Sequence, residues 1–207
     1  MNHSRKFLSF DISRNMINII ENLIFRLRCF RENTTIPFST RFIHPRNIYL
    51  GRDCVVDTDC YFKAGKDKRP YILIGNKVVI KSRSRISTTT GLIEISDFCY
   101  LGQNMWMGGK GNISIKKNSI FAMNVVIISS NHDYMNIPTP YYEGIEIRKD
   151  ITIGENVWVG ANSVILPGVT IEDGSVISAG SVVHGVIPKN SIASGNPAKV
   201  IHEIVRS

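Results

Sequence analysis

The sequence predicts a mainly β protein built as a parallel solenoid of stacked, three-sided coils. An aliphatic residue returns at every sixth position, at Ile153, Val159, Ile165, Ile171, Ile177 and Val183. Four residues after each of these stands a small or β-branched residue: Val157, Ser163, Val169, Ser175, Ser181 and Ile187. A helical period of 3.6 would lose this phase within two turns, and a strand period of 2 does not require the turn residue that often follows the aliphatic position. The repeat therefore favours short strands separated by corners.

The same unit recurs in shorter runs nearer the N-terminus, with aliphatic or aromatic positions at Leu50, Val56, Phe62, Ile74, Ile80, Ile86, Ile95, Leu101, Met107, Ile115, Phe121 and Ile127. Three units close one coil, and stacked coils share a continuous core. The breaks between runs are small insertions, of which KDKRPY at 66–71 is expected to be an exposed loop. Cys54, Cys60 and Cys99 each stand four residues after an aliphatic repeat position, where small residues recur, so we interpret them as small buried residues. Cys29 lies outside the pattern and has no assigned role.

The repeat has one long interruption, between Ile127 and Ile153, where about twenty residues are inserted. Long excursions from a rigid scaffold are places where functional residues concentrate. This one contains His132, flanked by Asn131, Asp133 and Tyr134. The sequence therefore predicts a catalytic loop near 129–150.

The composition fits an ordinary globular chain, with 43% hydrophobic and 20% charged residues in 207. The net charge is +8, and residues 1–50 hold eight Lys and Arg against three Asp and Glu. No zinc-finger spacing or other nucleic-acid motif accompanies this charge, so nucleic acid is not an expected partner. No apolar run is long enough for a membrane span, and no signal peptide is recognisable, which favours a cytoplasmic protein.

Residues 15–31 show the spacing of an amphipathic helix, with an apolar stripe at Met16, Ile19, Ile20, Leu23, Leu27 and Phe30. Arg26, Arg28 and Arg31 cluster near its end, where cations favour a helix C-terminus. We favour a helix that caps the open first coil or packs in an oligomer. The alternative is peripheral contact with an anionic membrane at its inner face.

The repeat and the tail IPKNSIASGNPAKVI (187–201) resemble the hexapeptide-repeat acyltransferases, in particular the galactoside and maltose acetyltransferase type, over roughly residues 48–201. The resemblance implies a left-handed parallel β-helix, a homotrimer with sites between neighbouring prisms, and acetyl-CoA as co-substrate with no metal. The expected organisation is an N-terminal helical segment at 1–35, the acyltransferase domain at 36–190 and a C-terminal tail at 191–207.

The resemblance also implies site residues. His132 would be the general base that takes the proton of a sugar hydroxyl. The segment NVWVGANSVILPGV (156–169) resembles the stretch that lines the pantetheine groove, so Trp158 and the backbone of Gly160, Ala161 and Ala179 would contact the donor, with Lys199 near its nucleotide. His184 and Gly185 depart from the family's Thr-Lys, and Gly102 replaces an acceptor-binding asparagine. The expected acceptor residues are Asn104, Trp106, Asn131, Asp133 and Tyr134.

The favoured function is therefore O-acetylation of a sugar hydroxyl, on a surface polysaccharide or its precursor. An amino-sugar N-acetyltransferase is disfavoured because no GxGxxG is present, whereas an antibiotic-modifying acetyltransferase stays open. A zinc hydratase like the gamma-type carbonic anhydrases would need histidines closely spaced with His132, and none is present. A non-catalytic scaffold on the same fold is the alternative from another class.

Overall fold

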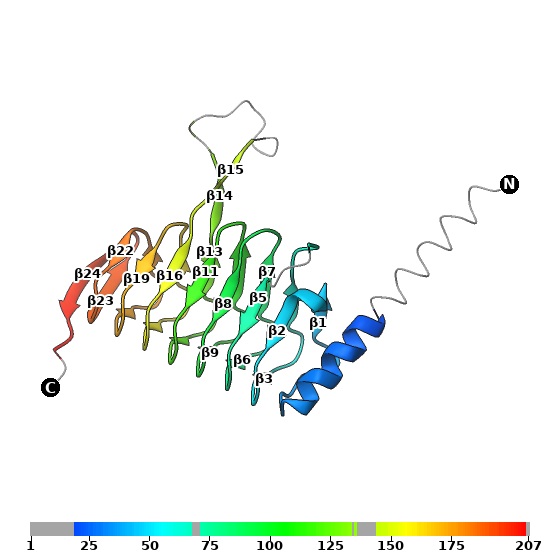
Figure 1. Cartoon of the computed structure of the whole chain (residues 1–207). Helices are drawn as coiled ribbons and strands as arrows, with labels where there is room; N and C mark the ends of the chain where they lie inside the picture. Colours follow the sequence, from blue (N-terminus) through cyan, green and yellow to red (C-terminus); the bar gives the residue numbers. More distant parts are fainter. Residues whose placement is uncertain (1–18, 68–70, 134, 136–143, 206–207) are drawn as a thin grey trace.

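The structure, a computed structural model, describes residues 19–67, 71–133, 135 and 144–205. Its body is a parallel β-solenoid in which the chain passes through three sheets in turn and stacks coil upon coil (Figure 1). The fold is the mainly β solenoid that the sequence predicts, and it agrees with the left-handed β-helix that the family resemblance implies.

The three sheets form the sides of the prism, and we name them A, B and C. Sheet B contains β1 (Arg41–Ile43), β4 (Tyr61–Lys63), β7 (Arg85–Thr88), β10 (Trp106–Gly109), β13 (Val126–Ile128), β18 (Val164–Ile165) and β21 (Val182–Val183). Sheet C contains β2 (Ile48–Leu50), β5 (Ile72–Ile74), β8 (Ile93–Ile95), β11 (Ile113–Ile115), β16 (Ile151–Ile153), β19 (Thr170–Ile171) and β22 (Val186–Ile187). Sheet A contains β3 (Val55–Val56), β6 (Val79–Ile80), β9 (Tyr100–Leu101), β12 (Ile120–Phe121), β17 (Trp158–Val159), β20 (Val176–Ile177), β23 (Ser191–Gly195) and the antiparallel β24 (Ala198–Glu203).

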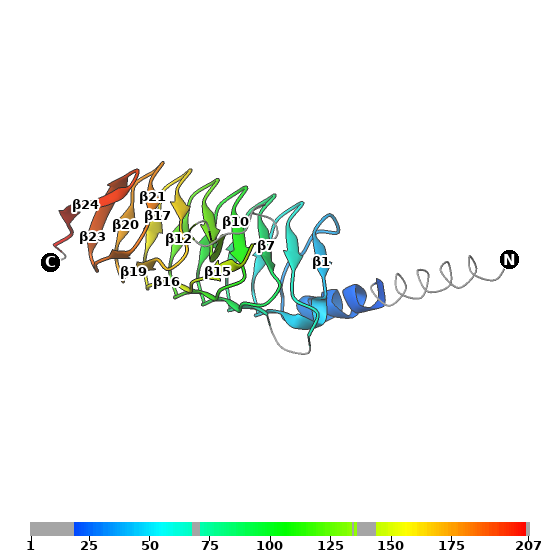
Figure 2. The same ribbon diagram turned by 90° about the horizontal axis from the view of Figure 1, so that it is seen from above.

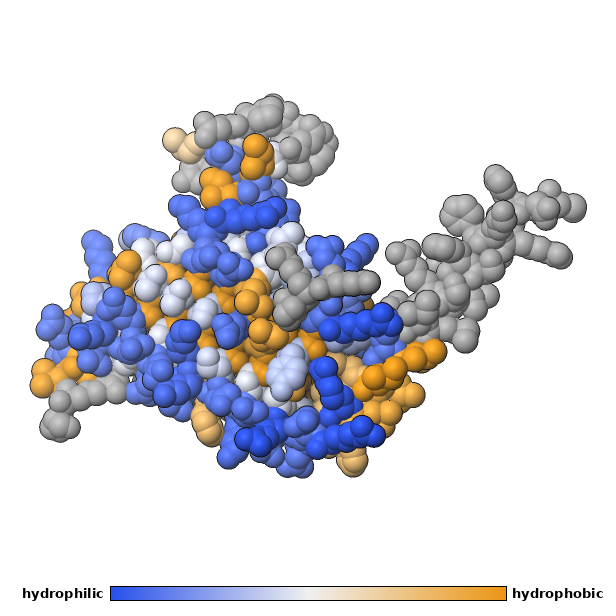
Figure 3. All heavy atoms as spheres, in the orientation of Figure 1, coloured by the Kyte–Doolittle hydropathy of each residue, from blue (hydrophilic) through white to orange (hydrophobic). Residues whose placement is uncertain are grey.

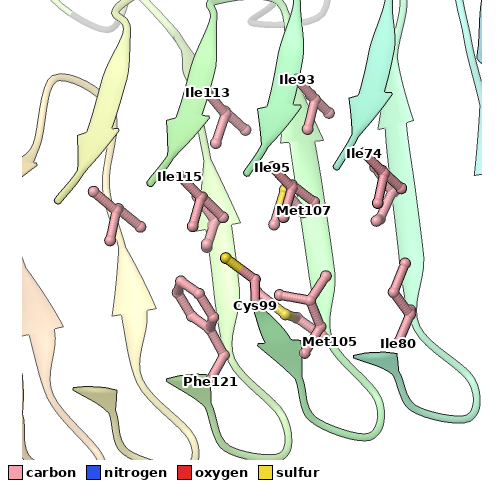
Figure 4. Close-up of a cluster of buried hydrophobic side chains, with 14 of the residues drawn as sticks. Ile74, Ile80, Ile93, Ile95, Cys99, Met105, Met107, Ile113, Ile115 and Phe121 are labelled. Carbon is pink, nitrogen blue, oxygen red and sulfur yellow. The ribbon is translucent and has the colours of Figure 1, made fainter. Parts of the chain in front are cut away.

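The core consists of the repeat positions, stacked in register from coil to coil. Ile153 pairs with Ile171, and Val159 with Ile177, so identical repeat positions lie one above another. All six aliphatic positions from Ile153 to Val183 are at most 1% exposed. Figure 4 shows earlier positions of the same kind pointing into the prism, with Ile95 and Ile115 on one side and Phe121 on another. The period of six is therefore the distance along the chain from one side of the prism to the next.

The small residues four positions later are buried as well, which confirms their predicted place. Ser163, Ser175 and Ser181 are fully buried, and each hydroxyl donates to a backbone carbonyl at a corner, those of Ser178, Pro188 and Ser178, respectively. A buried hydroxyl needs such a partner to offset its loss of water. Serine therefore both fits the narrow interior and satisfies a corner carbonyl.

The insertions between coils lie at one corner of the prism, between sheets B and C. They comprise residues 64–71, 89–92, 110–112 and 129–150. One sequence-based expectation is wrong here. Tyr71, placed in an exposed loop, is 1% exposed, and its hydroxyl bonds the Asp67 carboxylate at 2.9 Å. The Tyr71 ring packs against Gly65, whereas its partner Asp67 is exposed.

An N-terminal helix over residues 19–31 covers the open end of the first coil (Figure 1). Phe25 and Cys29 are its buried residues, and the Phe25 ring lies 4.6 Å from that of Phe42 in β1. Among the described residues, no helix has both the length and the apolar character that crossing a membrane requires. A short 3-10 helix, η1 (Pro45–Asn47), joins β1 to β2. The helix thus closes the core where a solenoid would otherwise expose it.

All four cysteines are reduced and buried, each about 1% exposed. Burial raises the pKa of the Cys29 thiol to about 11, and that of the Cys99 thiol also to about 11. The pKa values of Cys54 and Cys60 are raised for the same reason. The thiolate is the nucleophilic form, so these groups are poor nucleophiles at neutral pH.

We predict that the folded protein does not react with iodoacetamide at pH 8, because a raised pKa leaves almost no thiolate at that pH and the sulfur atoms are covered. Mass spectrometry after denaturation should show four alkylated cysteines, against none in the native sample. Rapid modification of Cys54, Cys60 or Cys99 in the native protein would contradict their assignment as core residues.

Candidate active site

The long insertion leaves the prism as an antiparallel arm. Its strands are β14 (Ser130–His132) and β15 (Glu146–Arg148), with His132 opposite Glu146. The arm starts at the end of β13 in sheet B and returns to β16 in sheet C, and it projects well away from the body (Figure 1). Seen from above, the arm overlies the middle coils of the prism (Figure 2). His132 is exposed on it. The interruption of the repeat therefore does produce a projecting element that carries this histidine.

The root of the arm is held by polar contacts to the coil beneath. Ser129 is fully buried, and its hydroxyl donates to the carbonyl of Gly111 at 2.9 Å. The Asp150 carboxylate accepts from the backbone and the side chain of Asn112, at 2.8 and 2.9 Å. Lys110 forms an ion pair with Glu146 of β15, with 2.9 Å between Nζ and Oε1. These contacts fix the direction in which the arm leaves the prism.

Two glycines allow this close approach. Gly109 has a φ of 129°, a conformation that favours glycine, and a Cβ on it would collide with the Ser129 hydroxyl. A Cβ on Gly91 would likewise collide with the backbone of Gly111 in the coil above. Side chains at these positions would push the root of the arm away from the corner.

The side chains of Asn131 and Asp133 accept hydrogen bonds from backbone N–H groups of the arm. The Asn131 side chain accepts from the backbone N–H of His132 at 2.9 Å, and the Asp133 carboxylate accepts from that of Met135 at 3.0 Å. No hydrogen bond to the imidazole is found among the residues that the structure describes. Asn131 and His132 alternate faces of the strand, because successive side chains of a strand point oppositely. Tyr134 lies outside the described residues.

The predicted donor residues gather at another corner, between sheets A and B. Trp158 begins β17 and is 56% exposed on the outer face of sheet A. Gly160 and Ala161 follow it at the corner, and Ala179 occupies the same place in the next coil, where a Cβ on Gly160 would lie 2.5 Å from the Ala179 nitrogen. Gly160 is buried and lets the two coils pack closely, whereas Ala161 is half-buried and Ala179 is exposed at the corner. This is a suitable surface for an extended apolar arm such as pantetheine.

Lys199 lies near the same corner through the C-terminal hairpin. In β24 it pairs opposite Ser194 of β23, and the adjacent Gly195 N–H donates to the buried Ser181 hydroxyl at 3.2 Å. Lys199 itself is exposed. The structure therefore brings the five predicted donor residues to one side of the C-terminal coils.

The predicted acceptor residues are divided. Asn131 and Asp133 lie on the arm, whereas Asn104 and Trp106 lie at the opposite edge of sheet B. Asn104 has a φ of 60°, and its amide donates to Asn124 at 3.0 Å, which donates in turn to Asn162 at 2.9 Å. This column of corner asparagines gives Asn104 a structural role that the sequence did not suggest. Trp106 is 36% exposed.

Sequence reasoning missed Lys110, Glu146 and Ser129, which orient the arm. Their only sequence signal is proximity to the insertion, because the contacts join residues from different coils. No group of three His, Cys, Asp or Glu that could hold a metal ion occurs among the described residues.

Comparison with known proteins agrees with this architecture. The family model "Bacterial transferase hexapeptide (six repeats)" matches residues 150–185. The Saccharomyces cerevisiae protein YJL218W, provisionally named an acetyltransferase, is 36% identical over 138 residues, which are 61% of this chain and 69% of that protein. Galactoside O-acetyltransferase of Escherichia coli K12 is 40% identical over 119 residues, so the match spans 54% of each chain. The chain thus covers about half the length of the bacterial enzyme.

Two solved structures share the fold. Maltose O-acetyltransferase from Clostridium difficile 630 superposes with a TM-score of 0.56 at 24% identity, over 92% of this chain and 89% of that one. AntD, an N-acyltransferase from Bacillus cereus in complex with dTDP-4-amino-4,6-dideoxyglucose and coenzyme A, gives a TM-score of 0.58 at 18% identity, over 84% and 82%.

The solenoid and its projecting arm define a hexapeptide-repeat protein. With the similarity to YJL218W over more than two thirds of that protein, the chain belongs to the hexapeptide-repeat acyltransferases, a family of enzymes.

Proposed function

We propose that this protein transfers the acetyl group of acetyl-CoA to a sugar hydroxyl on a surface polysaccharide or its precursor, in the cytoplasm. The observation that carries the proposal is the exposed imidazole of His132 on an arm whose root is fixed by Ser129, Lys110 and Asp150. The similarity to galactoside O-acetyltransferase supports acetyl as the group and a sugar as the acceptor.

The reaction needs one base and one oxyanion donor. His132 takes the hydroxyl proton while the oxygen attacks the thioester carbonyl, and a C–O bond forms as the C–S bond breaks. The imidazolium returns the proton to the departing sulfur, so coenzyme A leaves as the thiol. The backbone N–H of Ala161 at the donor corner suits the oxyanion, since a main-chain donor near small residues can be approached closely, whereas the Gly160 N–H already donates to the carbonyl of Ile177.

The site is assembled between subunits of a homotrimer. Within one chain, the arm leaves from one edge of sheet B, while the donor corner lies at the other edge. A base must reach within about 3 Å of the proton that it abstracts, so His132 and the donor corner need different chains. The outer row of sheet A suits the contact, because Val55, Tyr100, Ile120 and Trp158 are apolar and 40–56% exposed.

The N-terminal helix contributes to this assembly rather than to membrane binding. Two of its cations are already engaged: Arg26 donates to the carbonyls of Pro37 and Thr40, at 3.0 and 2.6 Å, and Arg28 to that of Ile48 at 3.0 Å. Its outer face is apolar, with Leu23, Ile24, Leu27 and Phe30 between 54% and 80% exposed (Figure 3). An apolar face with two of the three helix arginines bound to carbonyls of the body fits a protein surface better than an anionic bilayer.

We predict that His132→Ala lowers kcat/KM for acetyl transfer by about 10²–10⁴-fold, the range that a lost general base produces. The measurement is thiol release from acetyl-CoA with a saccharide acceptor. His184→Ala, which changes another exposed histidine, serves as the control and should retain activity. Equal turnover by the His132→Ala and unaltered enzymes would refute the proposed base.

Subunit complementation tests the shared site. His132→Ala removes the base, and Ala179→Trp fills the donor corner, so each variant alone should be inactive. Co-expressed chains should regain a substantial fraction of activity, because some sites then combine an intact His132 with an intact corner from a neighbour. If co-purified mixed oligomers recover no activity, His132 and the donor corner of one site must belong to the same chain, which would contradict the shared site.

The role of the helix is tested by Ile24→Ser with Leu27→Ser, two exposed positions whose change leaves Phe25 and Cys29 in place. We expect a smaller trimer fraction by light scattering, and no co-sedimentation of the unaltered protein with phosphatidylglycerol vesicles. Vesicle binding that the double variant loses, at unchanged oligomeric mass, would favour the membrane role.

A further inference from the structure

A row of cationic and aromatic side chains runs along the outer face of sheet B in its first four strands. The strand register places Arg41 next to Tyr61, Tyr61 next to Arg85, and Arg85 next to Trp106. We call these four residues the sheet-B strip. Neighbouring strands are about 4.8 Å apart, so the strip extends roughly 15 Å along the prism axis.

The outward-facing charges of these strands are positive. Arg41 and Arg85 are exposed, and Lys63 lies in the parallel outer row between Ile43 and Ser87. Neither outer row of these strands contains an acidic residue. The corresponding row of sheet C contains Glu94, and that of sheet A is apolar. The nearest carboxylates along the chain, Asp57 and Asp59, lie at the corner before β4, and Asp57 is paired with Lys81. Concentrated cations on the strands themselves attract an anionic ligand.

Arg85 is held in an orientation that leaves its donors available. Its guanidinium lies 4.9 Å from the centroid of the Tyr61 ring. A stacked guanidinium uses its face for the ring, while its N–H groups point outward in the plane. These N–H groups match a carboxylate, which can accept two parallel hydrogen bonds. Tyr61 is therefore a positioning residue for Arg85.

Trp106 is the last residue of the strip and begins β10, at the edge of sheet B opposite the arm. A Cβ on Gly108 would lie 3.4 Å from the far edge of the Trp106 ring, so the ring leans along its own strand toward the corner where the arm begins. In the next strand the row continues with Val126, and β13 leads directly into the arm. A ligand that follows the strip is thus led toward the arm that carries His132.

The strip and the predicted donor corner occupy different coils. The donor residues lie in β17 and beyond, whereas the strip ends at β10, two coils earlier. The arm leaves the prism between these two regions (Figure 1). Coenzyme A on the C-terminal coils would therefore leave the strip free for the second substrate.

We propose that the sheet-B strip binds an acidic saccharide chain, with its carboxylates on Arg41 and Arg85 and the apolar face of a sugar ring on Trp106. The inference deepens the proposed function, on which it rests, by naming an anionic polysaccharide as the acceptor class. Binding of the saccharide does not require His132, so this binding can be measured separately from catalysis.

The test measures equilibrium binding of an oligogalacturonate to the full-length protein in the absence of acetyl-CoA. Binding is monitored by Trp fluorescence and by calorimetry. Arg41→Gln with Arg85→Gln should raise Kd at least about tenfold, since two charge-assisted contacts are lost. Trp106→Phe should weaken binding less than Trp106→Ala. The affinity should fall as salt is added.

Three controls separate the possible outcomes. Arg52→Gln changes an exposed arginine outside sheet B and should leave Kd unchanged, and His132→Ala should bind as tightly as the unaltered protein while losing turnover. A neutral maltooligosaccharide of the same length should bind at least about tenfold more weakly. Equal affinity for the neutral chain, tighter binding of single-stranded DNA, or unchanged Kd in the folded double-arginine variant would each overturn the proposal.

Discussion

The structure depends on the in-register stacking of inward-facing aliphatic side chains in consecutive coils. Ile153 over Ile171 and Val159 over Ile177 are examples, and each such column buries its members almost completely. Burying an aliphatic side chain of this size contributes about 1.5–3 kcal/mol. Because the columns align, each coil also pairs its backbone with the next one. A rigid prism results, and departures from the repeat are forced to its corners.

Those departures share one corner of the prism, between sheets B and C. The longer connections between sheets B and C stack beneath the arm, where Gly91, Gly109 and Gly111 let backbones approach one another. Ser129, Asn112 and Lys110 then join the arm to this stack. An exposed two-stranded arm has little core of its own and is marginally stable alone. Its direction is therefore set by the corner beneath it rather than by its own sequence.

The outer faces of the prism differ in chemistry although the inner faces are nearly alike. Sheet A presents Tyr100, Ile120 and Trp158, which suit burial against another subunit, and sheet B presents Arg41 and Arg85 over its first coils. The inward positions must be apolar for the chain to fold, but the outward ones are not restricted in this way. Differences in substrate and assembly can therefore be encoded on the outer faces without changing the fold.

The sequence by itself determined the solenoid, its core and the place of the arm, since a period of six and its interruption are local patterns. It also predicted the buried roles of Cys54, Cys60 and Cys99, because these share the repeat position of small residues. Only the tertiary structure decided that Tyr71 is buried, that Asn104 belongs to an asparagine column, and that His132 and Ala179 lie at different corners. The tertiary structure also brought together the residues of the sheet-B strip, from Arg41 to Trp106. These features join residues twenty or more positions apart or depend on the path of a connection, and sequence spacing does not reveal which side chains then meet.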